Sequence, residues 1–177
     1  MEETGRTTAT AQEIEDLIAA FGNPATDARH AAVSALKTIG EAAVQPLIAA
    51  IARAPDNDRR WYAAIALSRI GEPAVFPLIM AMEKNPDHNF RRYAAAALGE
   101  IGESAADALI DGMASDDAEL RGFFSQALCR MGKPAVEHLT RRLDDPDPTV
   151  QQCVTLTLWQ MGETGIPEIV DKFRDEE

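Results

Sequence analysis

One short phrase, an isoleucine or methionine followed by glycine, recurs five times and restricts the chain to few folds. The glycines are separated by 31, 31, 30 and 30 residues and are Gly40, Gly71, Gly102, Gly132 and Gly162. A constant period of this length indicates a repeat architecture built from one supersecondary unit. Each glycine follows one apolar helical pattern and precedes another. We therefore expect each glycine to end a helix in the left-handed conformation, which glycine adopts without a Cβ clash.

The segment after each glycine places apolar residues on one helical face. At the positions 4, 7, 8 and 11 residues after each glycine, and at the matching N-terminal positions, 23 of 24 residues are apolar, against about 11 expected for a chain that is 46% apolar. These residues are Ile14, Leu17, Ile18, Phe21, Val44, Leu47, Ile48, Ile51, Val75, Leu78, Ile79, Met82, Ala106, Leu109, Ile110, Met113, Val136, Leu139, Thr140, Leu143, Ile166, Ile169, Val170 and Phe173, with Thr140 the polar exception. The period predicts an amphipathic helix after every glycine.

The segment before each glycine repeats as well. A leucine lies four residues upstream in every repeat, preceded by alanine except at Thr157: Leu36, Leu67, Leu98, Leu128 and Leu158. Loops between the paired helices read NPATD, PDND, PDHN, DDAE and DPDPT, which are rich in turn formers and N-caps. Two helices per repeat and no strand pattern predict an all-α fold, an α-solenoid.

The phrases PLIAAIARAPDNDRRWYAAIALSRIGE and PLIMAMEKNPDHNFRRYAAAALGEIGE carry a family resemblance. They resemble the HEAT repeat, especially the short HEAT-like repeats of the phycobilisome-lyase type. The resemblance implies a right-handed superhelix of five helical hairpins plus a closing C-terminal helix, with the second helix of each hairpin on the concave side. The expected repeats span residues 12–40, 41–71, 72–102, 103–132 and 133–162, followed by a helix over 164–174. We expect a single domain over residues 11–177 and a flexible tail over residues 1–10.

Charge and composition exclude several classes of partner. The formal net charge is −12, which disfavours nucleic acid and anionic membrane surfaces as partners. The sequence has neither an apolar run of about 18 residues nor a signal-peptide pattern at its N-terminus. Cys129 and Cys153 fit no disulfide framework or zinc motif. We expect a cytoplasmic protein without a membrane segment.

The polar residues give no pattern for catalysis. His30, His88 and His138 each stand alone, and no cofactor or metal motif is present. Four aspartates recur at one repeat position, each four residues before an arginine or, in the last repeat, Gln151: Asp56, Asp87, Asp117 and Asp147. A catalytic residue is needed once, whereas a structural residue recurs. We therefore interpret the aspartates as loop caps within a charge ladder, and we expect a non-enzymatic protein without cofactor or metal.

Residues that vary between repeats at non-core positions of the second helices are the candidates for recognition. Aromatic residues and arginine are enriched there, as at binding hot spots. The candidate partner-binding residues are Trp61, Tyr62, Ile65, Arg69, Arg92, Tyr93, Phe123, Gln126 and Arg130. They predict a concave groove that holds a helix or extended segment of another protein. The open alternative is that the aromatic residues only fill space between repeats.

A second apolar stripe, formed by Cys153, Leu156 and Trp159, lies on the last second helix. It predicts either self-association, as a homodimer through the C-terminal end, or coverage by the helix over 164–174. The sequence thus favours a protein–protein interaction module or adaptor. The family resemblance leaves open an alternative role as an auxiliary subunit of a bilin-lyase-like cofactor-attachment enzyme.

Overall fold

The computed structural model describes residues 9–175, without the side chains of residues 171–173 and 175. The α-helices are α1 Ala11–Ala19, α2 Thr26–Ile39, α3 Val44–Arg53, α4 Asn57–Ile70, α5 Val75–Lys84, α6 His88–Ile101, α7 Ala106–Gly112, α8 Ala118–Met131, α9 Lys133–Arg141, α10 Pro148–Gln160 and α11 Ile166–Asp175. Short 3₁₀ turns are η1 Ala20–Gly22, η2 Gly40–Ala43, η3 Glu72–Ala74, η4 Glu103–Ala105 and η5 Gly162–Thr164. No strand occurs within residues 9–175, and the predicted all-α fold of five hairpins and a terminal helix is confirmed.

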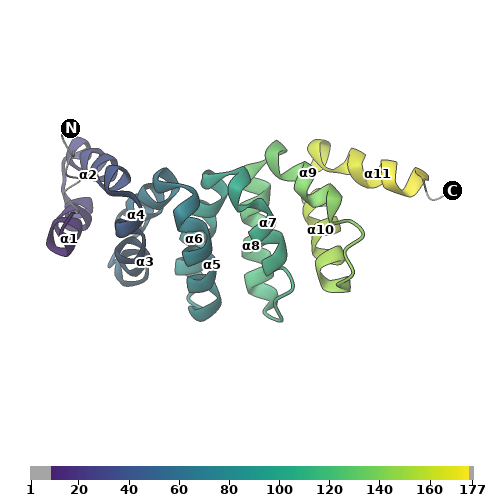
Figure 1. The fold of residues 1–177 in the computed structure, drawn as a ribbon, viewed down its shortest axis with the longest axis horizontal. Helices are drawn as coiled ribbons and strands as arrows, with labels where there is room; N and C mark the ends of the chain where they lie inside the picture. The colour runs from purple at the N-terminus through teal and green to yellow at the C-terminus, as the bar shows by residue number, and fades with distance from the viewer. Residues whose placement is uncertain (1–8, 176–177) are drawn as a thin grey trace, which may run out of the picture. The chain divides into compact units, whose positions relative to one another are not determined.

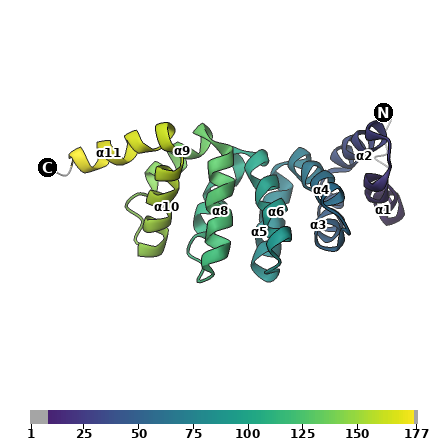
Figure 2. The same ribbon diagram turned by 180° about the vertical axis from the view of Figure 1, so that it is seen from behind.

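The chain divides into two compact units, residues 1–74 and residues 75–177. In the first unit, α1 and α3 form one layer of helices, and α2 and α4 form the other. In the second unit, α5, α7 and α9 form the first-helix layer, while α6, α8 and α10 pack side by side in the second-helix layer (Figures 1 and 2). Each unit is therefore a stack of helical hairpins, the arrangement of an α-solenoid. Because the chain divides into these two units, the single domain expected over residues 11–177 stays a prediction.

The apolar face of the first helices forms the core, as the period of the sequence predicts. All four face residues are buried in α3, in α5 and in the repeat that contains α7. The face becomes more exposed toward the chain ends, because Leu17 and Ile18 are half-buried and Val170 is exposed. The side chain of Phe173 lies outside the described residues. The five repeated leucines before the glycines are fully buried, which explains why each repeat retains them.

The five repeated glycines all have positive φ, between 60° and 89°. At Gly40, Gly71, Gly102 and Gly132 the predicted left-handed helical conformation is wrong in its second angle, because ψ lies between −134° and −150°. At Gly102 the φ of 89° combines with a ψ of −150°, and Gly71 has 84° and −140°. This region is open essentially to glycine alone, because a Cβ would clash with the peptide group. The glycine therefore reverses the chain between two helices rather than only capping the first.

The recurring aspartates cap the second helices. Asp56, Asp87, Asp117 and Asp147 are the N-cap residues of α4, α6, α8 and α10, and each side chain accepts a hydrogen bond from a backbone N–H in the first turn. Thr10 caps α1 through a reciprocal hydrogen-bond pair with Glu13. Thr10 thus belongs to the ordered start of α1, although it falls within the tail predicted for residues 1–10. Residues 1–8 lie outside the described residues.

One stretch in the described residues, Thr26–Arg53, is apolar and long enough to pass a simple test for a membrane-crossing helix, with a mean hydropathy of 1.2. The stretch is not one straight helix, because Gly40 and η2 divide it into α2 and α3. Its apolar residues Leu36, Leu47 and Ile51 are fully buried against other helices. The hydropathy of this stretch is therefore explained by the core of a helical hairpin.

Replacing Gly102 with alanine tests whether the chain reversal after α6 depends on a residue with positive φ. A Cβ at Gly102 would meet no atom within 4 Å outside its neighbours, so the cost is confined to the backbone. We expect Gly102→Ala to lower the free energy of unfolding by about 1–3 kcal/mol, measured by urea denaturation. The control is Gly122→Ala, because Gly122 lies inside α8 with similarly open space. This control should raise stability by about 0.5–1 kcal/mol. Equal stability of the two variants would contradict the role of positive φ.

Candidate protein-binding surface

In the first unit, the predicted recognition residues divide into an exposed set and a buried one. Trp61 is 45% exposed, Arg69 is exposed and Ile65 is half-buried, and the spacing of four residues places all three along one side of α4. Tyr62 is only 9% exposed. Its ring stacks on Phe21 with centroids 6.0 Å apart, and the guanidinium of Arg29 lies 4.9 Å from its centroid. Tyr62 therefore packs between helices and offers little surface to a partner.

In the second unit, Arg92, Gln126 and Arg130 are exposed on α6 and α8. Tyr93 is half-buried, and Arg92 lies over its ring at 4.9 Å and donates a hydrogen bond to its hydroxyl at 3.1 Å. Phe123 is 3% exposed and contacts the ring of His88 edge-on, with centroids 5.2 Å apart.

The expectation that Tyr62, Tyr93 and Phe123 together line an open surface is therefore wrong. Tyr62 and Phe123 are buried, and Arg92 covers part of the Tyr93 ring. The physical reason is their register on the second helices. They lie one residue from the outermost position, so a large side chain turns toward the neighbouring helix and fills the space between repeats. The alternative left open by the sequence, that aromatic residues pack between repeats, holds for Tyr62 and Phe123.

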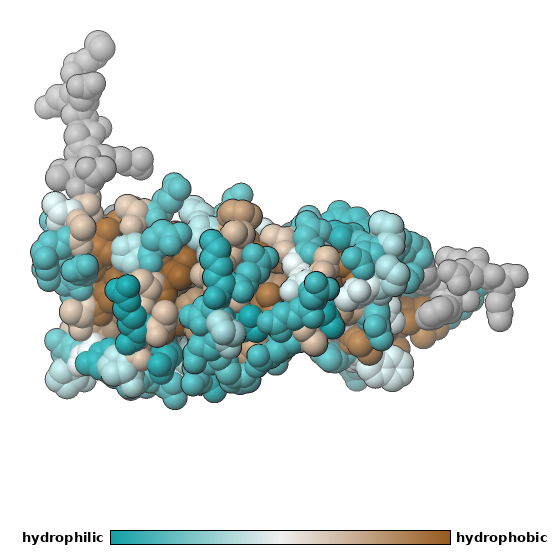
Figure 3. All heavy atoms as spheres, turned by 90° about the horizontal axis from the view of Figure 1, so that it is seen from below, coloured by the Kyte–Doolittle hydropathy of each residue, from teal (hydrophilic) through white to brown (hydrophobic). Residues whose placement is uncertain are grey.

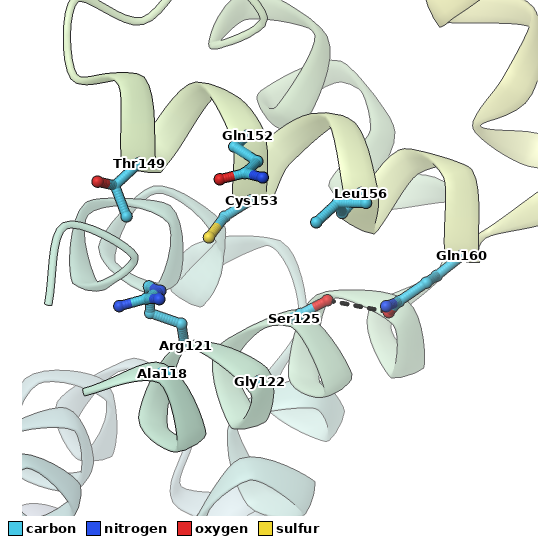
Figure 4. A pocket seen from close by; sticks show the side chains of 9 residues that line it. All are labelled: Ala118, Arg121, Gly122, Ser125, Thr149, Gln152, Cys153, Leu156 and Gln160. Carbon is cyan, nitrogen blue, oxygen red and sulfur yellow. Dashed lines mark hydrogen bonds between the residues drawn. The ribbon is translucent and has the colours of Figure 1, made fainter. Parts of the chain in front are cut away.

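A groove of about 310 Å³ lies between α8 and α10 on the second-helix layer (Figure 4). The residues that line it come from both helices: Ala118, Arg121, Gly122, Ser125, Thr149, Gln152, Cys153, Leu156 and Gln160. Figure 4 shows the sulfur of Cys153 pointing from α10 toward α8, and the side chain of Arg121 extending into the space between the helices. The groove thus combines an apolar wall with polar side chains that reach its opening.

At Gly122 the groove is lined by backbone without a side chain. At the same repeat position, the preceding repeats carry His30, Trp61 and Arg92. A Cβ at Gly122 would meet nothing within 4 Å, so the missing side chain leaves open space. The residues predicted for recognition on the second helices are large ones, and Gly122 is not among them. A small residue where the other repeats have large ones is the signal that would have located the groove.

Arginines of the second helices connect successive repeats. Arg91 is buried, and its guanidinium pairs with Asp117 of the next repeat at 2.8 Å and with Glu119 at 3.6 Å. Its Nε also donates hydrogen bonds to the carbonyl oxygens of Met82 and Asn85 at 3.1 and 3.0 Å. Arg29, at the equivalent position of the first repeat, pairs with Asp58 at 3.9 Å. These pairs form only part of the charge ladder that the sequence predicts, because Arg60 and Arg121, at the same repeat position, make no ion pair among the described residues.

Hydrogen bonds at the helix starts stabilise the charged form of the capping aspartates. The pKa of Asp117 is lowered by the backbone N–H of Leu120 and by Arg91. Asp145, two residues before the N-cap of α10, has its pKa lowered by the backbone N–H of Asp147 and by Arg142. Burial raises the pKa of the Cys129 thiol, which favours its protonated form.

The C-terminal stripe is exposed. Leu156 is 51% and Trp159 is 63% exposed, whereas Cys153 is half-buried at the wall of the groove. The terminal helix α11 packs on α10 but leaves Leu156 and Trp159 open, so it does not cover the stripe. Figure 3 shows hydrophobic atoms at the surface beside the grey C-terminal residues. Among the described residues, no group of three or more His, Cys, Asp or Glu side chains is placed to hold a metal ion.

Stacked helical hairpins with a repeated internal register define an α-solenoid repeat protein. Two family models match this chain. HEAT repeats match over residues 44–122, and the PBS lyase HEAT-like repeat matches over residues 28–53. The chain is a HEAT-repeat protein. HEAT repeats are generally scaffolds for protein interaction and are typically non-catalytic.

Solved structures match the chain only at low similarity. An engineered protein studied by crystallography has 18% identity and a TM-score of 0.35, covering 90% of this chain and 84% of its own. A de novo designed 16-helix transmembrane nanopore has 15% identity and a TM-score of 0.25, covering 90% of this chain and 53% of its own. At such scores neither structure supports an inference about function. No curated protein matches the chain.

Removing the Arg91 side chain tests the ladder. Arg91→Ala would leave two backbone carbonyls and the Asp117 carboxylate without their donor, so we expect the free energy of unfolding to fall by about 2–4 kcal/mol. Arg92→Ala, one residue further along and exposed, should change it by less than about 0.5 kcal/mol. Urea denaturation of both variants provides the comparison. Similar losses in the two variants would show that the buried pair does not connect the repeats.

Proposed function

We propose that this chain is a non-enzymatic interaction module that binds another protein on its second-helix layer, with the groove between α8 and α10 as the anchor. The observation that carries the proposal is that groove, since it is an open cavity of about 310 Å³ on the layer that the HEAT resemblance expects to be concave. A groove beside exposed Leu156 offers both shape and apolar area to a partner.

The surface around the groove has the residue types of a binding site. Gln126 and Arg130 are exposed on α8, and exposed Arg92 and half-buried Tyr93 lie on α6. In the first unit, exposed Trp61 and Arg69 form a separate patch on α4 with half-buried Ile65 between them. Large amphipathic side chains that remain exposed in a monomer commonly become anchors in a complex.

The alternative role in bilin attachment has less support. The PBS lyase HEAT-like description belongs to a class of repeat, and it matches only residues 28–53. The groove lies outside this segment, so the match provides no link between the cavity and a bilin. The free cysteines Cys129 and Cys153 support the expectation of a reducing compartment such as the cytoplasm.

Filling the groove tests the proposed function. Gly122→Trp restores a large side chain at the position where the second repeat has Trp61, and it should remove capture of partner proteins from a native lysate because the cavity is blocked. Glu137→Trp, on the exposed side of α9, is the matched control and should retain the same proteins as the unmodified chain. Circular dichroism should show equal helix content in all three proteins. Capture of an identical set of proteins by all three would contradict binding at the groove.

Self-association through Cys153, Leu156 and Trp159 remains a separate prediction. Trp159 has the largest exposed apolar side chain of the stripe, so Trp159→Lys should shift a dimer to monomer in sedimentation at high protein concentration. A monomer in the unmodified protein at the highest concentration measured would eliminate the homodimer.

A further inference from the structure

The charge ladder changes at the groove. In the ladder pairs described above, Arg29 pairs with Asp58, two residues after the N-cap of the next repeat, and Arg91 pairs with the N-cap Asp117 at 2.8 Å and with Glu119 at 3.6 Å. Arg121 occupies the same position in its repeat. The last repeat retains the N-cap Asp147 but has Thr149 in place of Glu119. Among the described residues Arg121 makes no ion pair, and its one hydrogen bond is donated to the carbonyl oxygen of Ser115 at 2.7 Å.

Arg121 therefore brings an unneutralised guanidinium to the groove. Guanidinium carries five N–H donors, and the bond to Ser115 uses one of them. None of the nine described residues that line the groove is acidic (Figure 4). This local excess of positive charge is unusual in a chain with a formal net charge of −12. Distant carboxylates oppose an acidic ligand only weakly, because charges beyond about 8 Å are largely screened at physiological ionic strength.

The far end of the groove also presents donors. The side-chain oxygen of Gln160 accepts hydrogen bonds from the Ser125 hydroxyl at 3.1 Å and from the Cys129 thiol at 3.9 Å. These bonds fix the orientation of the carboxamide, and its NH₂ group is left to donate to a ligand. Between Arg121 and Gln160, the wall consists of Cys153 and Leu156 above the bare backbone at Gly122. The groove thus offers donors at both ends and apolar surface between them.

We propose that the groove between α8 and α10 binds an acidic segment of a partner protein, in which a Glu or Asp carboxylate accepts hydrogen bonds from Arg121 and an adjacent apolar side chain packs on Leu156 and Cys153. The carboxylate takes the role that Asp117 and Glu119 have for Arg91 in the preceding repeat. This proposal rests on the proposed function and specifies the chemistry of the partner. A guanidinium–carboxylate contact selects its ligand by charge and by the geometry of two parallel hydrogen bonds.

The test uses the full chain and short peptides with blocked ends, labelled for fluorescence anisotropy. One set carries a leucine and a glutamate at varied spacing, and matched sets carry glutamine or lysine in place of the glutamate. We expect peptides of the glutamate set to bind, and the glutamine and lysine sets to bind about 10–100-fold more weakly, because a charge-assisted hydrogen bond is lost. Arg121→Gln should remove the preference for glutamate, whereas Arg141→Gln, at an exposed arginine of α9 that pairs with Asp107, should retain it.

A second variant guards against a folding defect in Arg121→Gln. Gln160→Glu keeps the oxygen that accepts from Ser125 but replaces the NH₂ donors with a carboxylate, so it should weaken binding of the glutamate set and spare the glutamine set. Equal affinity for the three peptide sets, preference for lysine, or absence of binding by every peptide would overturn the acidic-segment proposal. Gly122→Trp tests the proposed function separately. If the peptides overturned the acidic-segment proposal but Gly122→Trp still lost partner capture, protein binding at the groove would stand. If Gly122→Trp retained partner capture, protein binding at the groove would fail whatever the peptides showed.

Discussion

The structure depends on the burial of one apolar helix face against neighbouring repeats. A single hairpin of about 30 residues cannot cover its own apolar face, so stability arises only when hairpins stack. The fully buried Leu67 and Leu98, followed four residues later by a glycine with positive φ, show how the sequence couples packing to chain reversal. The leucine fixes the second helix to the core, and the glycine returns the chain to begin the next first helix. Polar interactions then adjust this framework at its surface.

The fold was predictable because its determinants recur. Any one glycine or aspartate is a weak signal, but a residue that returns every 30 or 31 positions has the same role each time. The N-caps at Asp87 and Asp117 and the buried faces of α3 and α5 follow directly from that period. The exact conformation of the glycines did not follow, because both the left-handed helical region and the observed region have positive φ and are open to glycine.

The candidate site was less predictable than the fold. It is formed by residues that differ from those at the same positions of the other repeats. Tyr62 and Phe123 looked like recognition residues by type, but a shift of one position around a helix turns such a side chain toward a neighbour. The groove depends instead on a missing side chain at Gly122 and on a threonine at position 149 where a carboxylate would complete the ladder. Thr157 is another departure, because its hydroxyl, buried where other repeats have alanine, donates to the carbonyl oxygen of Cys153 at 2.7 Å. The effect of a missing or unusual side chain of this kind can be recognised only when the neighbouring helix is in place.

The repeat position shared by Gly99, Cys129 and Trp159 affects how closely a neighbouring second helix can approach. At Gly99 a Cβ would come within 2.9 Å of the carbonyl oxygen of Ala127 and of the Cβ of Arg130, so α6 and α8 meet almost backbone to backbone. Trp159 places the bulkiest side chain at the same position on α10. The indole occupies the place of that bare backbone, so α10 cannot form the close contact that joins α6 and α8. A copy of the protein that docked head to tail on α10 would pack on the indole and not on bare backbone.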